Sequence, residues 1–276
     1  MNSKVYVGKL YSSLIKIINY KTITITFLSL GATYICHHFG YTADFPQALI
    51  ATAIVFPIVF SINSAYQRRE AALKSLAQIK SGGLCIYYAA RDWGDPKFDQ
   101  NNPFPERVKS LCLELLMDIE LFFIAQEEID TQREQVVYSR FSDFSKLIRE
   151  MRTVGITPSE ISRLSQYLNK MIMCFEEMKL IISYPTPITL RAYSKVFIFS
   201  FPIIYGPFFA HTFKDYTNGL SYVLPILYSF VLVSLDNIQE HLENPYDQLG
   251  EDDIRIEVKE YMKLFVDQEK SWDISA

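Results

Sequence analysis

The positions of apolar and charged residues divide the chain into two kinds of segment. Long stretches without acidic or basic side chains occur near both ends, whereas residues 68–195 carry dense charge. A helix crosses the hydrocarbon core of a bilayer with about 20 mainly apolar residues, and with about 17 at the short end. The pattern therefore predicts transmembrane helices over about 22–38, 45–62, 196–213 and 216–235.

The charged middle of the chain has the period of amphipathic helices. Residues 106–128 and 131–151 repeat apolar side chains at helical spacing between acidic and basic ones. A third helix is predicted to begin after Thr157, because Glu160 completes a capping box three residues later. It should end near residue 182, before two prolines. Strand signals are weak throughout, so the sequence predicts an all-α membrane protein.

Basic residues predict the orientation of the four spans. They gather before the first span, after the second and before the third, at Lys4, Lys9, Lys16, Lys21, Arg68, Arg69, Lys74, Lys80, Arg191 and Lys195. Because cytoplasmic connections are enriched in Lys and Arg, both termini are predicted to be cytoplasmic, in a multi-pass protein of a bacterial inner membrane or a similar bilayer. The cytoplasmic helical part is then about 68–195 and 236–276, within one domain over 1–276.

Composition and motifs narrow the function classes. The formal net charge of −4 argues against a nucleic-acid-binding protein, in which a basic excess is usual. The four cysteines form no CxxC pair, and the four histidines show no metal-ligand spacing. The sequence contains no glycine-rich phosphate loop. We therefore expect no enzyme activity, no bound metal and no cofactor.

Three stretches, in this order, resemble the bestrophin family of membrane channels. The first is "VFSINSAYQRREAA", an apolar span that ends in phenylalanine and continues through a polar step into arginine and an acid. The second is "SYPTPITLRAYSKVFIF", which approaches the third span through prolines. The third is "LVSLDNIQEHLENPYDQLGEDDI", with a Glu-Asn-Pro-aromatic step before an acidic cluster. The likeness covers nearly the whole chain and is closer to the compact bacterial and fungal members than to the animal channels.

The resemblance implies a homopentamer with a central pore that passes small anions such as chloride. Family members line the neck of this pore with three large apolar side chains at four-residue spacing on the second span. Placing the last neck aromatic on Phe60 puts the others at Phe56 and Thr52. Thr52 departs from the pattern, because a bulky apolar residue is usual there. The polar continuation of the pore lining would be Asn63, Ser64 and Gln67.

Helix geometry agrees with this assignment of the neck. Residues four apart lie on one stripe of a helix, so Thr52, Phe56 and Phe60 would face one direction. Phenylalanine presents a positive ring edge, which can tolerate a partly dehydrated anion, and a tight apolar ring can close a pore by dewetting. The alternative is that Phe56 and Phe60 pack against neighbouring spans.

An acidic cluster follows the fourth span at Asn244, Asp247, Glu251, Asp252 and Asp253. In animal bestrophins an acidic stretch at this place binds calcium, so the resemblance makes the cluster a candidate regulatory site. However, three residues separate Tyr246 from "GEDD", and His241 stands where a side-chain amide is expected. The cluster also lacks the EF-hand pattern. A helix N-cap followed by a solvated turn is the alternative.

Three functions stay open at this point. The first is an anion channel, with the lipid bilayer, further copies of the chain and small inorganic anions as its partners. The second is a sodium or potassium channel of the same fold, which the acidic balance of the cytoplasmic part favours. The third is a non-conducting membrane scaffold that binds a partner through its amphipathic helices.

Overall fold

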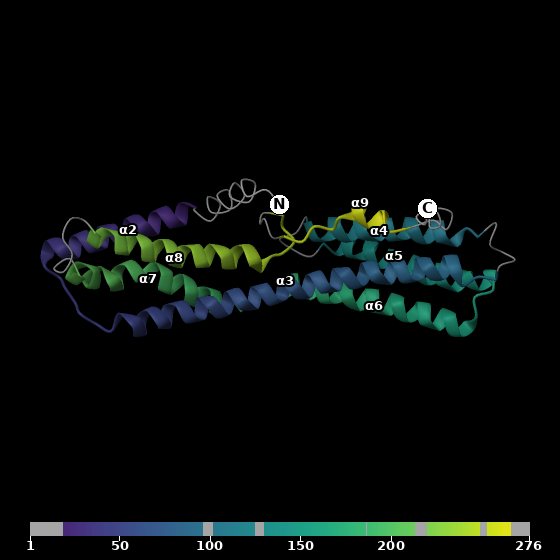
Figure 1. Ribbon diagram of the computed structural model, residues 1–276, viewed down its shortest axis with the longest axis horizontal. Coiled ribbons are helices and arrows are strands. Elements are labelled where there is room, and N and C mark those ends of the chain that lie inside the picture. Colours follow the sequence, from purple (N-terminus) through teal and green to yellow (C-terminus); the bar gives the residue numbers. More distant parts are fainter. Residues whose placement is uncertain are drawn as a thin grey trace, which may run out of the picture. The chain divides into compact units, whose positions relative to one another are not determined.

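The computed structural model describes residues 19–95, 102–124, 130–185, 187–212, 220–248 and 253–265. These residues form helices joined by short connections, and no strand occurs among them (Figure 1). The helices are α2 (Tyr20–Phe39), α3 (Gln47–Asp92), α4 (Phe104–Ile124), α5 (Thr131–Glu150), η2 (Met151–Val154), α6 (Pro158–Ser183), α7 (Ile188–Thr212), α8 (Leu220–Glu243) and α9 (Val258–Met262). The all-α fold class predicted from the sequence is confirmed.

The chain divides into two compact units, each built from two separate stretches. Unit 1 comprises residues 1–67 and 185–243, and unit 2 comprises residues 68–184 and 244–276. Helix α3 is continuous across the boundary between residues 67 and 68. The three boundaries along the chain fall near the predicted changes between apolar and charged sequence.

Unit 1 consists of α2, α7, α8 and the first part of α3. The first three of these helices pack against one another in all pairs (Figure 1). Helices α2 and α7 approach closely at Gly206, where an added Cβ atom would lie 3.3 Å from Ala32 and from the Cys36 sulfur. The core of the unit joins all four helices through Ile25, Ile54, Ile58, Ile198, Phe201, Tyr205, Phe209, Leu232 and Val233.

Unit 2 packs α4, α5, α6, α9 and the remainder of α3 around a larger apolar core. Its centre is aromatic, because the Phe175 ring lies within 6.0 Å, between ring centroids, of Phe122, Phe123, Tyr138 and Phe141. Burial of such rings is a main source of stability in a folded domain. A C-terminal segment, residues 253–265, adds Ile254, Ile256, Tyr261 and Phe265 to this core.

Helix boundaries show where sequence patterns were informative. The capping box at α6 forms as predicted, with the Thr157 backbone N–H donating to the Glu160 carboxylate at 2.9 Å. Helix α3 passes through Pro57 and continues far beyond the apolar run of the second predicted span. Helix α7 begins at Ile188, before the charge-free stretch of the third span. Residues 125–129, at the predicted end of the helix over 106–128, lie outside the described part.

Two stretches in the described part are apolar and long enough to cross a bilayer as helices. They are Arg191–His211 in α7 and Tyr222–Glu243 in α8, with mean hydropathies of 1.2 and 1.3. Helix α2 and the first part of α3 are not among these stretches. The first two spans therefore stay predictions from the sequence.

Candidate functional site

Helix α3 carries an exposed stripe in unit 1 that contains the predicted neck. The side chain of Phe56 is 58% exposed and that of Phe60 is 56% exposed, and Thr52 is exposed as well. On the opposite side of the helix, Ile54 and Ile58 are buried in the core of unit 1. Spacing of four residues and selective burial thus place the three predicted neck residues on one outward face.

The two neck phenylalanines contact each other rather than the core of their own subunit. Their ring centroids are 4.7 Å apart and their planes are nearly perpendicular, at 82°. Edge-to-face pairs of this kind hold aromatic side chains in a defined relative orientation. Packing within the subunit therefore does not account for the outward position of Phe56 and Phe60.

The predicted polar continuation lies on the same helix, one to two turns further along. Asn63 and Gln67 are exposed, and Ser64 is half-buried. On the other side of this segment of the helix, Ser61 and Ala65 are buried, at 0% and 1% exposure. The exposed stripe therefore changes from aromatic to polar within unit 1.

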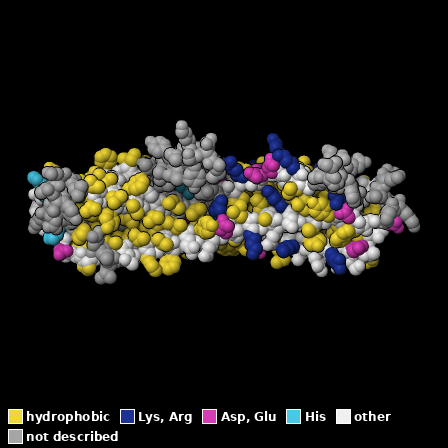
Figure 2. Space-filling view, viewed as in Figure 1, with side chains coloured by type: hydrophobic (Ala, Val, Ile, Leu, Met, Phe, Trp, Pro, Cys, Tyr) yellow, Lys and Arg dark blue, Asp and Glu magenta, His cyan; other side chains and the backbone are white. Residues whose placement is uncertain are grey.

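Apolar side chains also cover the outside of unit 1 on its other helices. Figure 2 shows them as a broad surface over α2, α7 and α8, whereas charged side chains are numerous over unit 2. The exposed members include Ile23, Phe27, Tyr34, Val196, Phe199, Ile203, Val223, Leu227 and Val231. A soluble protein rarely exposes an apolar surface of this extent, which is typical of contact with lipid or with another protein.

The predicted acidic cluster is only partly within the described residues. Glu251 and Asp252 lie outside them. The side-chain oxygen of Asn244 accepts a hydrogen bond from the Tyr246 backbone N–H at 3.3 Å, and the Ile254 N–H donates to the Pro245 carbonyl at 2.8 Å. Asn244 thus stabilises a turn that follows α8. In the described part, no three His, Cys, Asp or Glu side chains come together as metal ligands.

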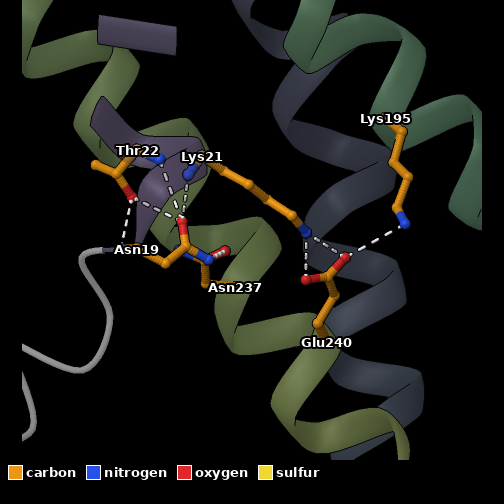
Figure 3. Close-up of polar contacts among 6 residues, drawn as sticks. All are labelled: Asn19, Lys21, Thr22, Lys195, Asn237 and Glu240. Carbon is orange, nitrogen blue, oxygen red and sulfur yellow. Dashed lines mark hydrogen bonds and ion pairs between the residues drawn. The ribbon is translucent and has the colours of Figure 1, made fainter. Parts of the chain in front are cut away.

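A polar cluster in unit 1 joins residues that the sequence analysis treated only as separate charges. The Lys21 ammonium donates to both carboxylate oxygens of Glu240, at 2.6 and 2.5 Å, and Lys195 lies 3.3 Å from the same carboxylate (Figure 3). The Asn19 amide donates to the Asn237 side-chain oxygen at 2.8 Å. One acid thus joins α2, α7 and α8. Lys21 and Glu240 are far apart in the sequence, so no local signal pairs them.

A second set of contacts fixes α3 within unit 2. Ser75 is buried and donates a hydrogen bond to the Glu177 carboxylate of α6 at 2.8 Å. Arg68 donates to the Ile181 carbonyl in the last turn of α6. The Tyr261 hydroxyl of α9 donates to the Lys80 carbonyl at 2.8 Å. These bonds orient one side of α3 toward its own subunit.

Helix α9 packs against α3 at a glycine, where α3 has no side chain. A Cβ atom on Gly83 would lie 2.6 Å from the Tyr261 hydroxyl oxygen and 2.8 Å from the Cys112 sulfur, so only glycine fits. Burial raises the pKa of the Cys112 thiol to about 12, and burial also raises the pKa of Tyr261. Both groups are therefore neutral at physiological pH, and the contact is a packing contact rather than a reactive centre.

Comparison with known proteins finds solved structures of the same fold. No protein-family model and no curated protein matches the chain. Among solved structures, a point mutant of a bacterial bestrophin homolog from Klebsiella pneumoniae matches with a TM-score of 0.70 and 14% identity, over 91% of this chain and 100% of that one. Another point mutant of that homolog matches with a TM-score of 0.68 and 14% identity, over 89% and 96%. The structure of the homolog phased with zinc matches with a TM-score of 0.68 and 12% identity, over 89% and 94%.

These likenesses extend over nearly the full length of both chains. At 12% and 14% identity they show the fold and nothing finer. The chain therefore has the fold of the bacterial bestrophin homologs, which confirms the resemblance found in the three sequence stretches.

Proposed function

We propose that this chain is an integral membrane protein that assembles as a homopentamer into an ion channel for small anions such as chloride. Unit 1 would lie in the bilayer, with both termini and unit 2 on the cytoplasmic side. The pore neck would consist of Thr52, Phe56 and Phe60 from each subunit, followed by Asn63, Ser64 and Gln67. The observation that carries this proposal is the outward position of Phe56 and Phe60 on a helix whose opposite face is buried.

The exposure of the two rings supports a contact with other copies of the chain or with a pore. In a ring of five subunits, one such stripe from each subunit can converge on a central axis. The aromatic residues would then form a narrow apolar passage, which can be closed by loss of water and needs no separate plug. The bestrophin fold and the apolar surface of unit 1 support the same arrangement.

The neck also suggests how ions pass. Perpendicular phenylalanine rings present some of their positive edges toward the axis, and these edges interact favourably with an anion that has lost part of its hydration shell. Thr52 would make the first ring wetter than the two that follow, because its hydroxyl can bind water. An ion would therefore lose its water in steps rather than at once.

Ion flux from lipid vesicles tests this function. Purified protein in chloride-loaded liposomes should release chloride, and the double variant Phe56→Ala with Phe60→Ala should release it faster or with less ion discrimination. Thr52→Leu should slow the release by narrowing the first ring. Phe199→Ala is the matched control, because Phe199 is 53% exposed on α7 and lies outside the proposed neck.

The subunit number gives an independent test. Mass measurement of the detergent-solubilised protein should give five copies. A single copy, or absence of chloride flux from both the wild type and the double neck variant, contradicts the channel and favours a non-conducting scaffold. Flux of potassium or sodium in place of chloride contradicts the anion assignment alone.

A further inference from the structure

The exposed face of α3 does not end at the polar residues after the proposed neck. In unit 2, the exposed positions of this helix include Glu70, Lys74, Ala77 and Ser81, at helical spacing. Along the helix, Lys74 follows Gln67 by two turns and Phe60 by four, so the same face continues in register. A pore lined by the first part of α3 would therefore be bordered by these residues beyond the neck.

Lys74 supplies the net charge of this face. The exposed charged residues of α3 in the described part are Glu70, Lys74 and Asp92. The Glu70 carboxylate is neutralised by Arg69 at 2.9 Å, and that of Asp92 by Arg91 at 2.6 Å. No ion pair joins the Lys74 ammonium to any described residue, so each subunit presents one uncompensated positive charge on this face.

The other basic residues nearby on α3 are directed elsewhere. Arg68 is bound to a carbonyl of α6, and the ammonium of Lys80 lies 5.9 Å from the centroid of the Tyr261 ring. Carboxylates from other elements also face this part of α3: Glu177 of α6 is held by the buried Ser75, and Glu120 and Glu257 interact with Lys80. Lys74 is thus the basic residue whose charge remains available on the exposed face.

We propose that Lys74 determines the sign of the ion that this channel passes. Five copies would place a ring of ammonium groups around the pore on the cytoplasmic side of the neck, a device that concentrates anions and repels cations. This inference rests on the proposed pentameric channel. It adds a charged ring to the aromatic neck as a determinant of the discrimination between chloride and potassium.

Reversal potentials in planar bilayers under a potassium chloride gradient test this role. The wild type should be chloride-selective, and Lys74→Gln should lower the ratio of chloride to potassium permeability several-fold. Lys74→Glu should lower it further, on the order of tenfold or more, because a ring of like charges acts on every passing ion. Lys74→Arg keeps the charge and should keep the ratio.

Lys146→Glu provides the matched control. Lys146 is exposed on α5 and pairs with Asp143 at 2.9 Å, so this variant makes the same change in net charge away from the α3 face. Its reversal potential should equal that of the wild type. Because the measurement uses only channels that conduct, a folding defect cannot imitate a change of selectivity. If Lys74→Glu does not conduct, the permeability ratios of Lys74→Gln and Lys74→Arg are compared instead, and they show whether the charge at this position determines selectivity.

Three results overturn the inference. One is a Lys74→Glu channel, or in its absence a Lys74→Gln channel, with the wild-type reversal potential. Another is an equal shift in Lys146→Glu, which would indicate a general charge effect. The third is a wild-type channel that already prefers potassium, which leaves the channel function intact. A wild type that carries no current at all contradicts the proposed function itself.

Discussion

The two units of this chain bury different kinds of side chain. The core of unit 2 is apolar and rich in rings, and among the described residues Ser75 is its one fully buried polar side chain. Unit 1 has a smaller apolar core, yet it buries most of the polar side chains that are buried in the described part: Thr22, Ser29, Thr33, Ser61, Ser194, Ser229, Asp236, Asn237 and Gln239.

The contrast is the one expected if unit 1 lies in lipid and unit 2 in water, as proposed above. In water, burial of apolar area drives helices together, so unit 2 can place its phenylalanines inside and its charges outside. In lipid, apolar side chains gain little by leaving the outside. Helices then associate through small residues and hydroxyl groups that permit close approach, and this is the composition between the helices of unit 1. The following predictions test how far this difference extends, in order of decreasing effect.

Removal of a central ring should affect unit 2 most. Phe175→Ala deletes a fully buried side chain that contacts four other aromatic rings, and we expect a loss of about 3–5 kcal/mol in the free energy of unfolding. Denaturant unfolding in detergent, followed by the fluorescence of Trp93 beside this core, measures the change. Phe199→Ala on the exposed face of α7 should change the value by less than about 0.5 kcal/mol. Equal losses in both variants would contradict an aqueous type of core in unit 2.

Two buried serines provide a matched pair, one in each unit. Ser75→Ala leaves the Glu177 carboxylate without its hydrogen bond and should cost about 1–2 kcal/mol. Within the described residues the Ser229 hydroxyl has no hydrogen-bond partner, so Ser229→Ala should leave stability within about 0.5 kcal/mol or raise it. Thermal unfolding of the two variants in the same detergent makes the comparison. A larger loss for Ser229→Ala would show that its hydroxyl hydrogen-bonds to a group beyond the described residues.

Loss of the shared acid in unit 1 should have the smallest effect of the three. Glu240→Gln removes the carboxylate that pairs with both Lys21 and Lys195, but Asp236 still interacts with both lysines and their ammonium groups keep contact with solvent. We expect a loss of about 0.5–1 kcal/mol, which salt should reduce. Glu260→Gln in unit 2 removes the more exposed pair with Lys263 and is the control, with no measurable loss. The free energy of unfolding of both variants, measured at low and at high salt, makes the comparison. A loss that is insensitive to salt would contradict an electrostatic origin.

The helices of this fold could be predicted from the sequence because their signals are local. The capping box of Thr157 and Glu160 and the amphipathic period of α4 and α5 lie within a few residues of the structure that they specify. The ends of α3 and α7 were less predictable. A change from apolar to charged sequence indicates a change in the surroundings of a helix. It does not end the helix, because the backbone hydrogen bonds can continue through it.

The candidate site was predictable in part for the same reason. The stripe of Phe56 and Phe60 follows from helical spacing, and its exposure agrees with the prediction, although its role as a neck stays a proposal. The pairing of Lys21 with Glu240 and the contact of Gly83 with Tyr261 depend on tertiary structure across long separations. In the sequence Lys74 is only one of several basic residues. That no described acidic residue pairs with it becomes visible only from the positions of those residues in the structure.

The division of each unit into two separate stretches has a consequence for synthesis on the ribosome. Unit 2 receives most of its helices early, but Tyr246 stacks on Phe123 at 4.3 Å between ring centroids, and residues 253–265 complete the same core. These parts are translated only after α7 and α8, the last helices of unit 1. The nascent unit 2 must therefore wait with an uncovered apolar surface until unit 1 has been made. Synthesis of α7 and α8 thus comes before the closing of unit 2, and a chain that stalls after Glu243 would expose that surface to chaperones and proteases.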